Sequence, residues 1–342
     1  MDIVEIKTAL LSLAPEVRAL LLSEIEREAS IHSAILEKRR DKLNNKIGSC
    51  PHCNSKKYRK NGIDKGSQRY YCNSCKRTFT EYTGTWMASI HKKELLGDYL
   101  KLMEQELSLD KIRDRLKINK KTAFDWRHKV LSGLDNTDKG EFTGITESDE
   151  TFFLFSEKGK EQENRLPRKR GGKASKRGIS DEQVAVIVTT DRNSEMDMTV
   201  AKLGRIRKND IDSAIGQRVS EKTILCSDGH VSYKGFAIDK VLEHHALRAD
   251  LKQYVKQGIY HIQHVNSIDN RLKKWIENRF WGVSTKYLQK YLNWFKIKER
   301  LKNSNEYLKE FSYKIIEDNS TWLRFKNIEK NYNVLIINAS LN

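Results

Sequence analysis

Two closely spaced pairs of cysteines constrain this 342-residue chain more than any other feature of its sequence. The motif "CPHC" contains Cys50 and Cys53, the motif "CNSC" contains Cys72 and Cys75, and 18 residues separate the pairs. Four thiolates from two such pairs can form a tetrahedral shell around Zn²⁺, and this separation is typical of structural zinc sites. We therefore predict a zinc ribbon over residues 47–84. Four protein ligands would leave that ion no open position for chemistry.

The charge of the chain indicates a polyanionic partner. The sequence has 64 Lys and Arg against 46 Asp and Glu, a net charge of +18. A surplus of this size favours nucleic acid first and an acidic membrane surface second. No apolar run approaches the roughly 20 residues that cross a bilayer, and the N-terminal segment lacks the basic region of a secretory signal. We expect a cytoplasmic protein that acts on nucleic acid.

Residues 1–46 have the pattern of helices. Apolar residues recur near a 3.6-residue period, and Pro15 interrupts them. The segment could be a helical hairpin packed on its own chain or an arm for oligomerisation. A single sequence does not separate these two interpretations.

Residues 91–134 predict a second DNA-binding module, a helix-turn-helix. Within "SLDKIRDRLKINKKTAFDWRHKVL" a first helix is followed by a turn at "KIN" and by a second helix that starts near Lys120. In this motif the second helix enters the major groove of DNA. An ordinary helical bundle is the alternative. The polar face of the second helix is predicted to present Lys120, Lys121, Thr122, Asp125, Arg127 and His128, of which Lys120, Lys121, Thr122 and Arg127 are the candidates for DNA contact.

Residues 141–303 change to an α/β pattern. Four β-rich segments cover residues 144–156, 182–191, 195–204 and 222–230, and a short fifth strand follows within 240–249. A long polar insertion separates the first two strands, and a helix over 207–220 joins the third to the fourth. This order predicts a layered α/β fold with a mixed sheet. Helices return from about residue 265, and residues 304–342 form a C-terminal extension.

Two aspartates occupy strand positions that suggest chemistry. Asp149 lies in the middle of "TESDETFF", and Asp228 ends the strand in "ILCSDGH". Aspartates at neighbouring strand ends can hold hard cations such as Mg²⁺, and paired ions stabilise the attacking and leaving oxygens of a phosphoryl displacement. Alone, each aspartate has a structural alternative, because it could be solvated or part of a turn. Together, after two DNA-binding modules, they favour a nuclease or a strand-transfer enzyme.

The order of these parts resembles bacterial insertion-sequence transposases of the DDE type, in the zinc-ribbon group related to insertion-sequence superfamily 1595. The matching blocks are "CPHC…CNSC", "ESDETFF", "RKRGGKASKRGISDEQVAV", "LCSDGH" and "HVNSIDNRLKKW…GVSTKYLQKYLNWF". The resemblance implies an RNase H-like catalytic domain with two catalytic aspartates. It also implies a third acidic or amide residue, followed seven positions later by a lysine. On this chain the four positions are Asp149, Asp228, Asn266 and Lys273.

Asn266 stands where many relatives would have a carboxylate. An amide oxygen can coordinate Mg²⁺ or Mn²⁺, but it is neutral and binds more weakly than a carboxylate. Seven helical residues return nearly to the same face, so Lys273 could contact a phosphate beside Asn266. Alternatively, Asn266 caps a helix, and Asp269, which is spaced to pair with Lys273, is a rival ligand. Glu150 and Glu147 are weaker rivals, and we favour Asn266.

The insertion over residues 157–180 has nine basic and three acidic residues. Such a segment is usually a solvated run of charge. Because it follows Asp149, we prefer a role along the DNA backbone, with ordering on DNA. Its candidate contact residues are Arg168, Lys169, Arg170, Lys173, Lys176 and Arg177.

These observations predict a zinc ribbon, a helix-turn-helix and an RNase H-like α/β domain. We expect a transposase that binds the terminal inverted repeats of its element and uses Mg²⁺ or Mn²⁺ to cleave and join double-stranded DNA, at both transposon ends and target. It is expected to be a homo-oligomer with no membrane partner, in the bacterial cytoplasm and nucleoid-associated when bound. A catalytically inactive DNA-binding regulator and a metal-dependent nuclease without strand transfer are the alternatives.

Overall fold

The computed structural model describes residues 2–64, 66–135, 140–159, 172–316 and 319–340, without the side chains of residues 23–24, 26–33 and 337–340. The chain divides into two compact units. Unit 1 contains residues 1–133 and 305–322, and unit 2 contains residues 134–304 and 323–342. Within the described residues, no helix combines the length and the apolar character that crossing a membrane requires.

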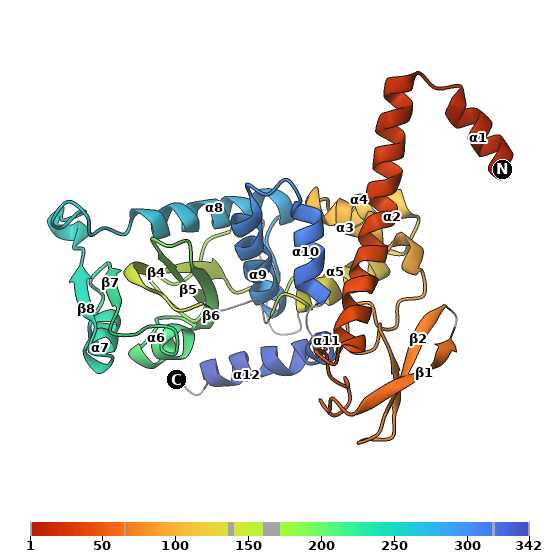
Figure 1. Cartoon of the computed structure of the whole chain (residues 1–342). Helices are drawn as coiled ribbons and strands as arrows, with labels where there is room; N and C mark the ends of the chain where they lie inside the picture. Colours follow the sequence, from red (N-terminus) through yellow and green to blue (C-terminus); the bar gives the residue numbers. More distant parts are fainter. Residues whose placement is uncertain (1, 65, 136–139, 160–171, 317–318, 341–342) are drawn as a thin grey trace. The chain divides into compact units, whose positions relative to one another are not determined.

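Unit 1 begins with two helices, α1 (Ile3–Leu11) and α2 (Pro15–Asn44) (Figure 1). Asp2 caps α1 in a reciprocal capping box with Glu5, and Pro15 occupies the first turn of α2, where its missing N–H costs nothing. No residue of α1 is buried, whereas Ile35, Leu36 and Leu43 near the end of α2 belong to the core. Among the described side chains of residues 2–25, none is buried.

The cysteine region forms a three-stranded antiparallel sheet of β1 (Tyr58–Asp64), β2 (Ser67–Cys72) and β3 (Thr78–Thr80). Its small core consists of Tyr58, Tyr70 and Phe79, whose ring centroids lie 5.2–5.8 Å apart, together with Leu43 of α2. So few apolar side chains cannot stabilise a sheet of this size on their own, which is why such modules usually depend on a metal.

The helix-turn-helix region comprises η1 (Lys93–Leu95), α3 (Leu96–Glu104), α4 (Leu109–Leu116) and α5 (Lys120–Ser132), with α10 (Tyr307–Ile316) packed beside α3 and α5. Lys117 adopts the left-handed conformation that ends α4, and Asn119 caps α5. One prediction for this region is wrong: Arg127 and His128 are not on an exposed face. Both are buried, because the packed side of α5 includes them, and the Arg127 guanidinium donates to the Leu107 carbonyl at 2.6 Å.

Unit 2 is built on a mixed five-stranded sheet, as predicted for the α/β domain. Its strands are β4 (Gly144–Leu154), β5 (Gln183–Asp191), β6 (Met196–Leu203), β7 (Thr223–Ser227) and β8 (Glu243–Ala246). Their order is β6-β5-β4-β7-β8, in which β4, β5 and β6 pair antiparallel and β4, β7 and β8 pair parallel. The central strand β4 carries Asp149.

Helices cover both faces of this sheet (Figure 1). The helices α6 (Lys208–Ile215) and α7 (Val231–Asp239) pack on a core that includes Ala185 and Ile187 of β5. Neighbouring residues of a strand point to opposite faces, so Val186 points to the other side. On that side α8 (Gln263–Phe280) contacts β4 and β5, and α9 (Thr285–Leu301) contacts β6. The turn η2 (Ala249–Leu251) precedes α8, while α11 (Thr321–Lys326) and α12 (Ile328–Ser340) end the chain.

Candidate functional site

The parallel pair β4 and β7 brings the two predicted aspartates side by side. Glu147 of β4 pairs with Cys226 of β7, and the same register, continued by two residues, sets Asp149 beside Asp228. Gly229 has a φ of +86°, which lets the chain turn sharply after Asp228. The Asp228 carboxylate accepts a hydrogen bond from the His230 backbone N–H at 2.8 Å, which holds it at the end of the strand.

The charges of Asp149, Glu150 and Asp228 interact, although Glu150 points to the opposite face of β4 from Asp149. Burial raises the pKa of Asp149 to about 7, with further increases from the charges of Glu150 and Asp228 and an opposing effect of Lys273. Burial likewise raises the pKa of Glu150 to about 7, helped by Asp228 and opposed by a hydrogen bond from Tyr233. Neighbouring carboxylates that resist ionisation together are typical of sites that bind a cation.

Helix α8 adds a third element to this cluster through Asp269. Its side chain is buried, and burial and the charge of Asp149 raise its pKa to about 7, against the effect of Lys273. Asp269 Oδ1 is a buried oxygen with no hydrogen-bond donor in the part of the chain that the structure describes. Leaving such oxygens unpaired is costly, and hard divalent cations are bound by carboxylate oxygens. These residues therefore fit a Mg²⁺ or Mn²⁺ site.

Asn266 lies on the same helix but in a different environment. It is exposed, and its N–H donates to the Ile262 carbonyl as the fourth residue of α8. The helix-cap alternative is therefore wrong, because the N-cap is Ile262. Asn266, Asp269 and Lys273 recur at i, i+3 and i+7, which places them near one face. Of Asn266 and Asp269, the structure buries Asp269.

Glu147 does not join the carboxylate cluster as a rival ligand. Its side chain is 1% exposed and contacts the first turn of α8, where it accepts hydrogen bonds from His264 and Val265. It also accepts a hydrogen bond from Arg192, and His261 lies 3.3 Å away. The sequence carried no local signal of this contact, because 116 residues lie between Glu147 and His264.

The four predicted zinc ligands converge in unit 1. The Sγ atoms of Cys50 and Cys75 are 3.8 Å apart, and those of Cys53 and Cys72 are 3.6 Å apart. A tetrahedral ion with bonds of about 2.3 Å to sulfur requires Sγ–Sγ distances of about 3.8 Å. The residue after each pair has a φ of +58°, so the two knuckles have matching backbones. The four thiols fit a structural metal ion.

The predicted DNA-contact residues differ in their exposure and in their contacts. Lys120 and Lys121 are exposed at the start of α5, where they form ion pairs with Asp110 and Asp125, and Thr122 is half-buried. In the insertion, Lys173, Lys176 and Arg177 are exposed. Three further candidates, Arg168, Lys169 and Arg170, lie outside the residues that the structure describes.

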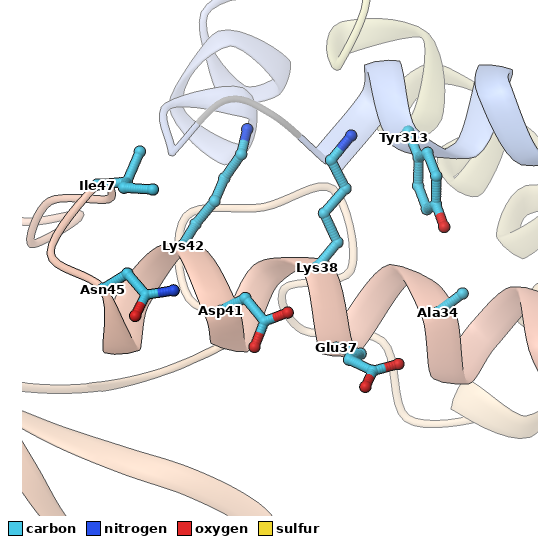
Figure 2. A pocket seen from close by; sticks show the side chains of 8 residues that line it. All are labelled: Ala34, Glu37, Lys38, Asp41, Lys42, Asn45, Ile47 and Tyr313. Atoms are coloured by element: carbon cyan, nitrogen blue, oxygen red, sulfur yellow. The ribbon is translucent and has the colours of Figure 1, made fainter.

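Unit 1 also has a hollow between α2 and α10, shown in Figure 2. Lys38 and Lys42 lie on its lining with Glu37 and Asp41, and the Lys38 ammonium is 4.1 Å from the centre of the Tyr313 ring. Acidic and basic groups alternate along this helix, and exposed pairs of this kind are mostly solvated. The hollow is not a candidate for the chemistry of the carboxylate cluster, which belongs to unit 2.

Comparison with known proteins finds similarity to a transposase domain over the α/β part of the chain. Residues 141–299 match the ISXO2-like transposase domain. The chain is 26% identical over 257 residues to an uncharacterized protein in transposable element ISH50 of Halobacterium salinarum, which covers 74% of this chain and 85% of that protein. A chain of a pre-cleavage Mos1 transpososome aligns over 70% of this chain and 78% of that chain, with 13% identity and a TM-score of 0.25, too low to bear on the fold. Asp149, Asp228 and Asp269 all lie within the matched region. The similarity to the ISXO2-like transposase domain covers 159 of the 342 residues and includes the whole five-stranded sheet and α8.

Proposed function

We propose that this protein is a transposase that binds the terminal inverted repeats of its insertion sequence and catalyses metal-dependent DNA cleavage and strand transfer. The main support for the proposal is a buried carboxylate cluster within the region that matches the transposase domain, in which Asp269 Oδ1 has no donor among the described residues. A regulator that had lost catalysis would gain nothing from keeping these charges together, because the cluster costs stability in the folded protein.

The catalytic ion, Mg²⁺ or Mn²⁺, is held by Asp149, Asp228 and Asp269 in this proposal. Asp269 replaces our sequence-based choice, Asn266, because Asp269 is buried and interacts with Asp149, whereas Asn266 is exposed. A bound divalent ion supplies activation of water or a DNA 3′-hydroxyl and stabilises charge on the phosphate. Lys273, one turn after Asp269, offers a cation to a phosphate that approaches the cluster.

DNA contacts are assigned to both units. In unit 1 the ribbon, with Zn²⁺ on its four cysteines, and the start of α5 with Lys120 and Lys121 would bind the transposon ends. In unit 2 the basic insertion, including Lys173 and Arg177, would follow the phosphate backbone. Because its proposed substrates are the transposon ends and target DNA of a bacterial cell, the protein would act in the cytoplasm at the nucleoid.

Transposition joins two DNA ends, so we propose a homo-oligomer, and the N-terminal arm is its candidate contact. We define the arm as residues 3–25 of α1 and the start of α2. Large apolar side chains are exposed along it, with Leu20 at 68%. They are Ile3, Val4, Ile6, Leu11, Val17, Leu20, Leu21, Leu22 and Ile25. Contiguous exposed apolar residues commonly mark a protein interface.

A cleavage assay on DNA with the element's ends, with and without Mg²⁺, tests the function. Wild type should cleave, and Asp149→Ala should bind the ends but not cleave. If the two proteins are equally inert while both bind DNA, the inactive regulator is correct. Joined DNA products separate a transposase from a nuclease, which would release ends without transferring them.

The third ligand is tested by two matched alanine variants on one helix. Asp269→Ala should abolish cleavage and leave end binding intact, and Asn266→Ala should cleave at close to the wild-type rate. The opposite pattern would restore Asn266 as the ligand and refute the assignment of Asp269.

A further inference from the structure

The Glu147 carboxylate connects the catalytic strand to the catalytic helix. Its Oε2 accepts hydrogen bonds from the backbone N–H groups of His264 at 2.9 Å and Val265 at 3.2 Å. Its Oε1 accepts from His264 Nδ1 at 2.7 Å and from the Arg192 guanidinium at 3.2 Å. Both oxygens of this buried carboxylate are thus occupied by donors, three of them from the first turn of α8.

These contacts extend the local cap of α8, in which the Gln263 N–H lies 3.3 Å from His261 Nδ1, to the next two N–H groups. The first N–H groups of a helix have no intrahelical partner, and a side chain just before the helix usually accepts from them. The residue in that position is Ile262, whose side chain cannot accept a hydrogen bond. Glu147 supplies the acceptor from β4, and its negative charge also favours the positive end of the helix dipole.

The spacing of the residues means that this cap also fixes the position of α8 along β4. On β4, Glu147 and Asp149 are two residues apart on one face, about 7 Å along the strand. On α8, Val265 and Asp269 are four residues apart, about 6 Å along the axis. Glu147 accepts a hydrogen bond from Val265, and Asp269 lies near enough to Asp149 for the Asp149 charge to act on it, so the separations along strand and helix match for both pairs.

We propose that Glu147 is a positioning residue that fixes the start and rotation of α8, so that Asp269 faces Asp149. The contacts show the cap itself, and its catalytic consequence rests on the proposed function. Removing the Glu147 charge would free the first turn of α8 and loosen the position of Asp269, without touching the ion or the DNA.

Glu147 could instead be a metal ligand, because it forms a group with His261 and His264 whose ligand atoms lie within 4.8 Å of one another. The contacts argue against this. The Arg192 guanidinium already places a cation at the group and donates to His261 Nε2 at 3.1 Å and to the Ile259 carbonyl at 2.8 Å. A metal ion would have to compete with Arg192 and with the positive helix end.

The test compares Glu147→Gln with Asp191→Asn as a matched control. Asp191, at the end of β5, is also a buried carboxylate that accepts from backbone N–H groups, those of Thr143, Asn193 and Glu195. None of these three donors belongs to α8. The measurements are amide hydrogen exchange, binding of end DNA, and the Mg²⁺ dependence of single-turnover cleavage.

In Glu147→Gln we expect faster amide exchange at His264 and Val265 and unchanged end binding. We also expect a loss of about 10–100-fold in Mg²⁺ affinity or cleavage rate, as for residues that orient metal ligands. Asp191→Asn should lose stability but keep the exchange of α8 and the Mg²⁺ dependence. Should Glu147→Gln fail to fold, Glu147→Asp keeps the charge with a shorter reach and should show the same pattern more weakly.

Three results would overturn the proposal. They are wild-type exchange at the start of α8 in Glu147→Gln, equal loss of Mg²⁺ affinity in Glu147→Gln and the control, or a bound metal, measured by elemental analysis, that Glu147→Gln alone removes. Failure of the proposed function is distinguishable, because wild type itself would then not cleave, while the exchange data would still report on the cap.

Discussion

Ionised Asp149 should destabilise the folded protein when no divalent cation is bound, and Asp149→Asn should relieve this cost. Burial and the neighbouring carboxylates raise its pKa from 3.8 to about 7. A difference of about three pH units corresponds to about 4 kcal/mol of free energy of unfolding once the group is fully ionised. The pKa values of Asp149, Glu150 and Asp269 are raised partly by one another. We therefore include only the pKa shift of Asp149 in this free energy.

The sign follows from proton binding. The pKa of Asp149 is higher in the folded protein than in the unfolded chain, so the folded protein binds more protons between pH 4 and pH 7. The free energy of unfolding therefore falls as pH rises through that range, and the cost is complete above about pH 7. Asparagine is neutral throughout. Relative to wild type, Asp149→Asn should gain about 3 kcal/mol between pH 5 and pH 8.

Thermal unfolding at pH 5 and pH 8, without added divalent cation, measures this gain. In a domain of 150–250 residues, 1 kcal/mol shifts Tm by about 2–4 °C, so the relative Tm of Asp149→Asn should rise by several degrees at pH 8. Mg²⁺ at pH 8 should raise the Tm of wild type and leave that of the variant nearly unchanged. If the Tm difference between the two proteins is the same at both pH values, ionisation of Asp149 does not destabilise the folded protein as we predict.

Three further predictions concern unit 1. Cys72→Ser should lose bound zinc and unfold the ribbon, which elemental analysis and proteolysis would detect, since a sheet this small depends on its metal. Lys121→Ala should weaken end binding for all sequences alike and reduce the slope of log affinity against log salt by about 1, and a sequence-selective loss would contradict a phosphate contact. Leu20→Glu should shift light scattering toward a smaller oligomer without lowering Tm, and an unchanged mass would exclude the arm as the interface.

The sequence predicted the strands well because their signals are local. The apolar runs of β4 and β5, and the turn after Asp228, depend on residues close in the chain. The helix α7 was not predicted, because Gly235 interrupts it and Val231 and Ile238 leave apolar side chains on its exposed side. Its N-terminus is fixed by His230, whose Nδ1 accepts from the Ser232 N–H, a cap with no standard sequence signature.

The choice between Asn266 and Asp269 as the proposed third ligand could not be made from the sequence for a different reason. Asn266 and Asp269 are three residues apart, so their side chains leave α8 in directions about 60° apart. A small rotation of the helix therefore decides which of the two faces Asp149. Helical periodicity cannot decide between them, because the rotation of α8 is set by a carboxylate more than a hundred residues earlier, Glu147. The local sequence contains both candidate ligands, and the contact between Glu147 and α8 determines which of them faces Asp149.

This selection gives a last prediction. If Glu147 fixes the rotation of α8, then in Glu147→Gln a turn of about 60° lets Asn266 take the place of Asp269 part of the time. The residual cleavage of Glu147→Gln should therefore fall further when Asn266→Ala is added, although Asn266→Ala alone leaves wild-type cleavage nearly intact. Single-turnover rates of the four proteins form a double-mutant cycle. A coupling free energy of zero would show that Glu147 does not set the rotation that presents Asp269.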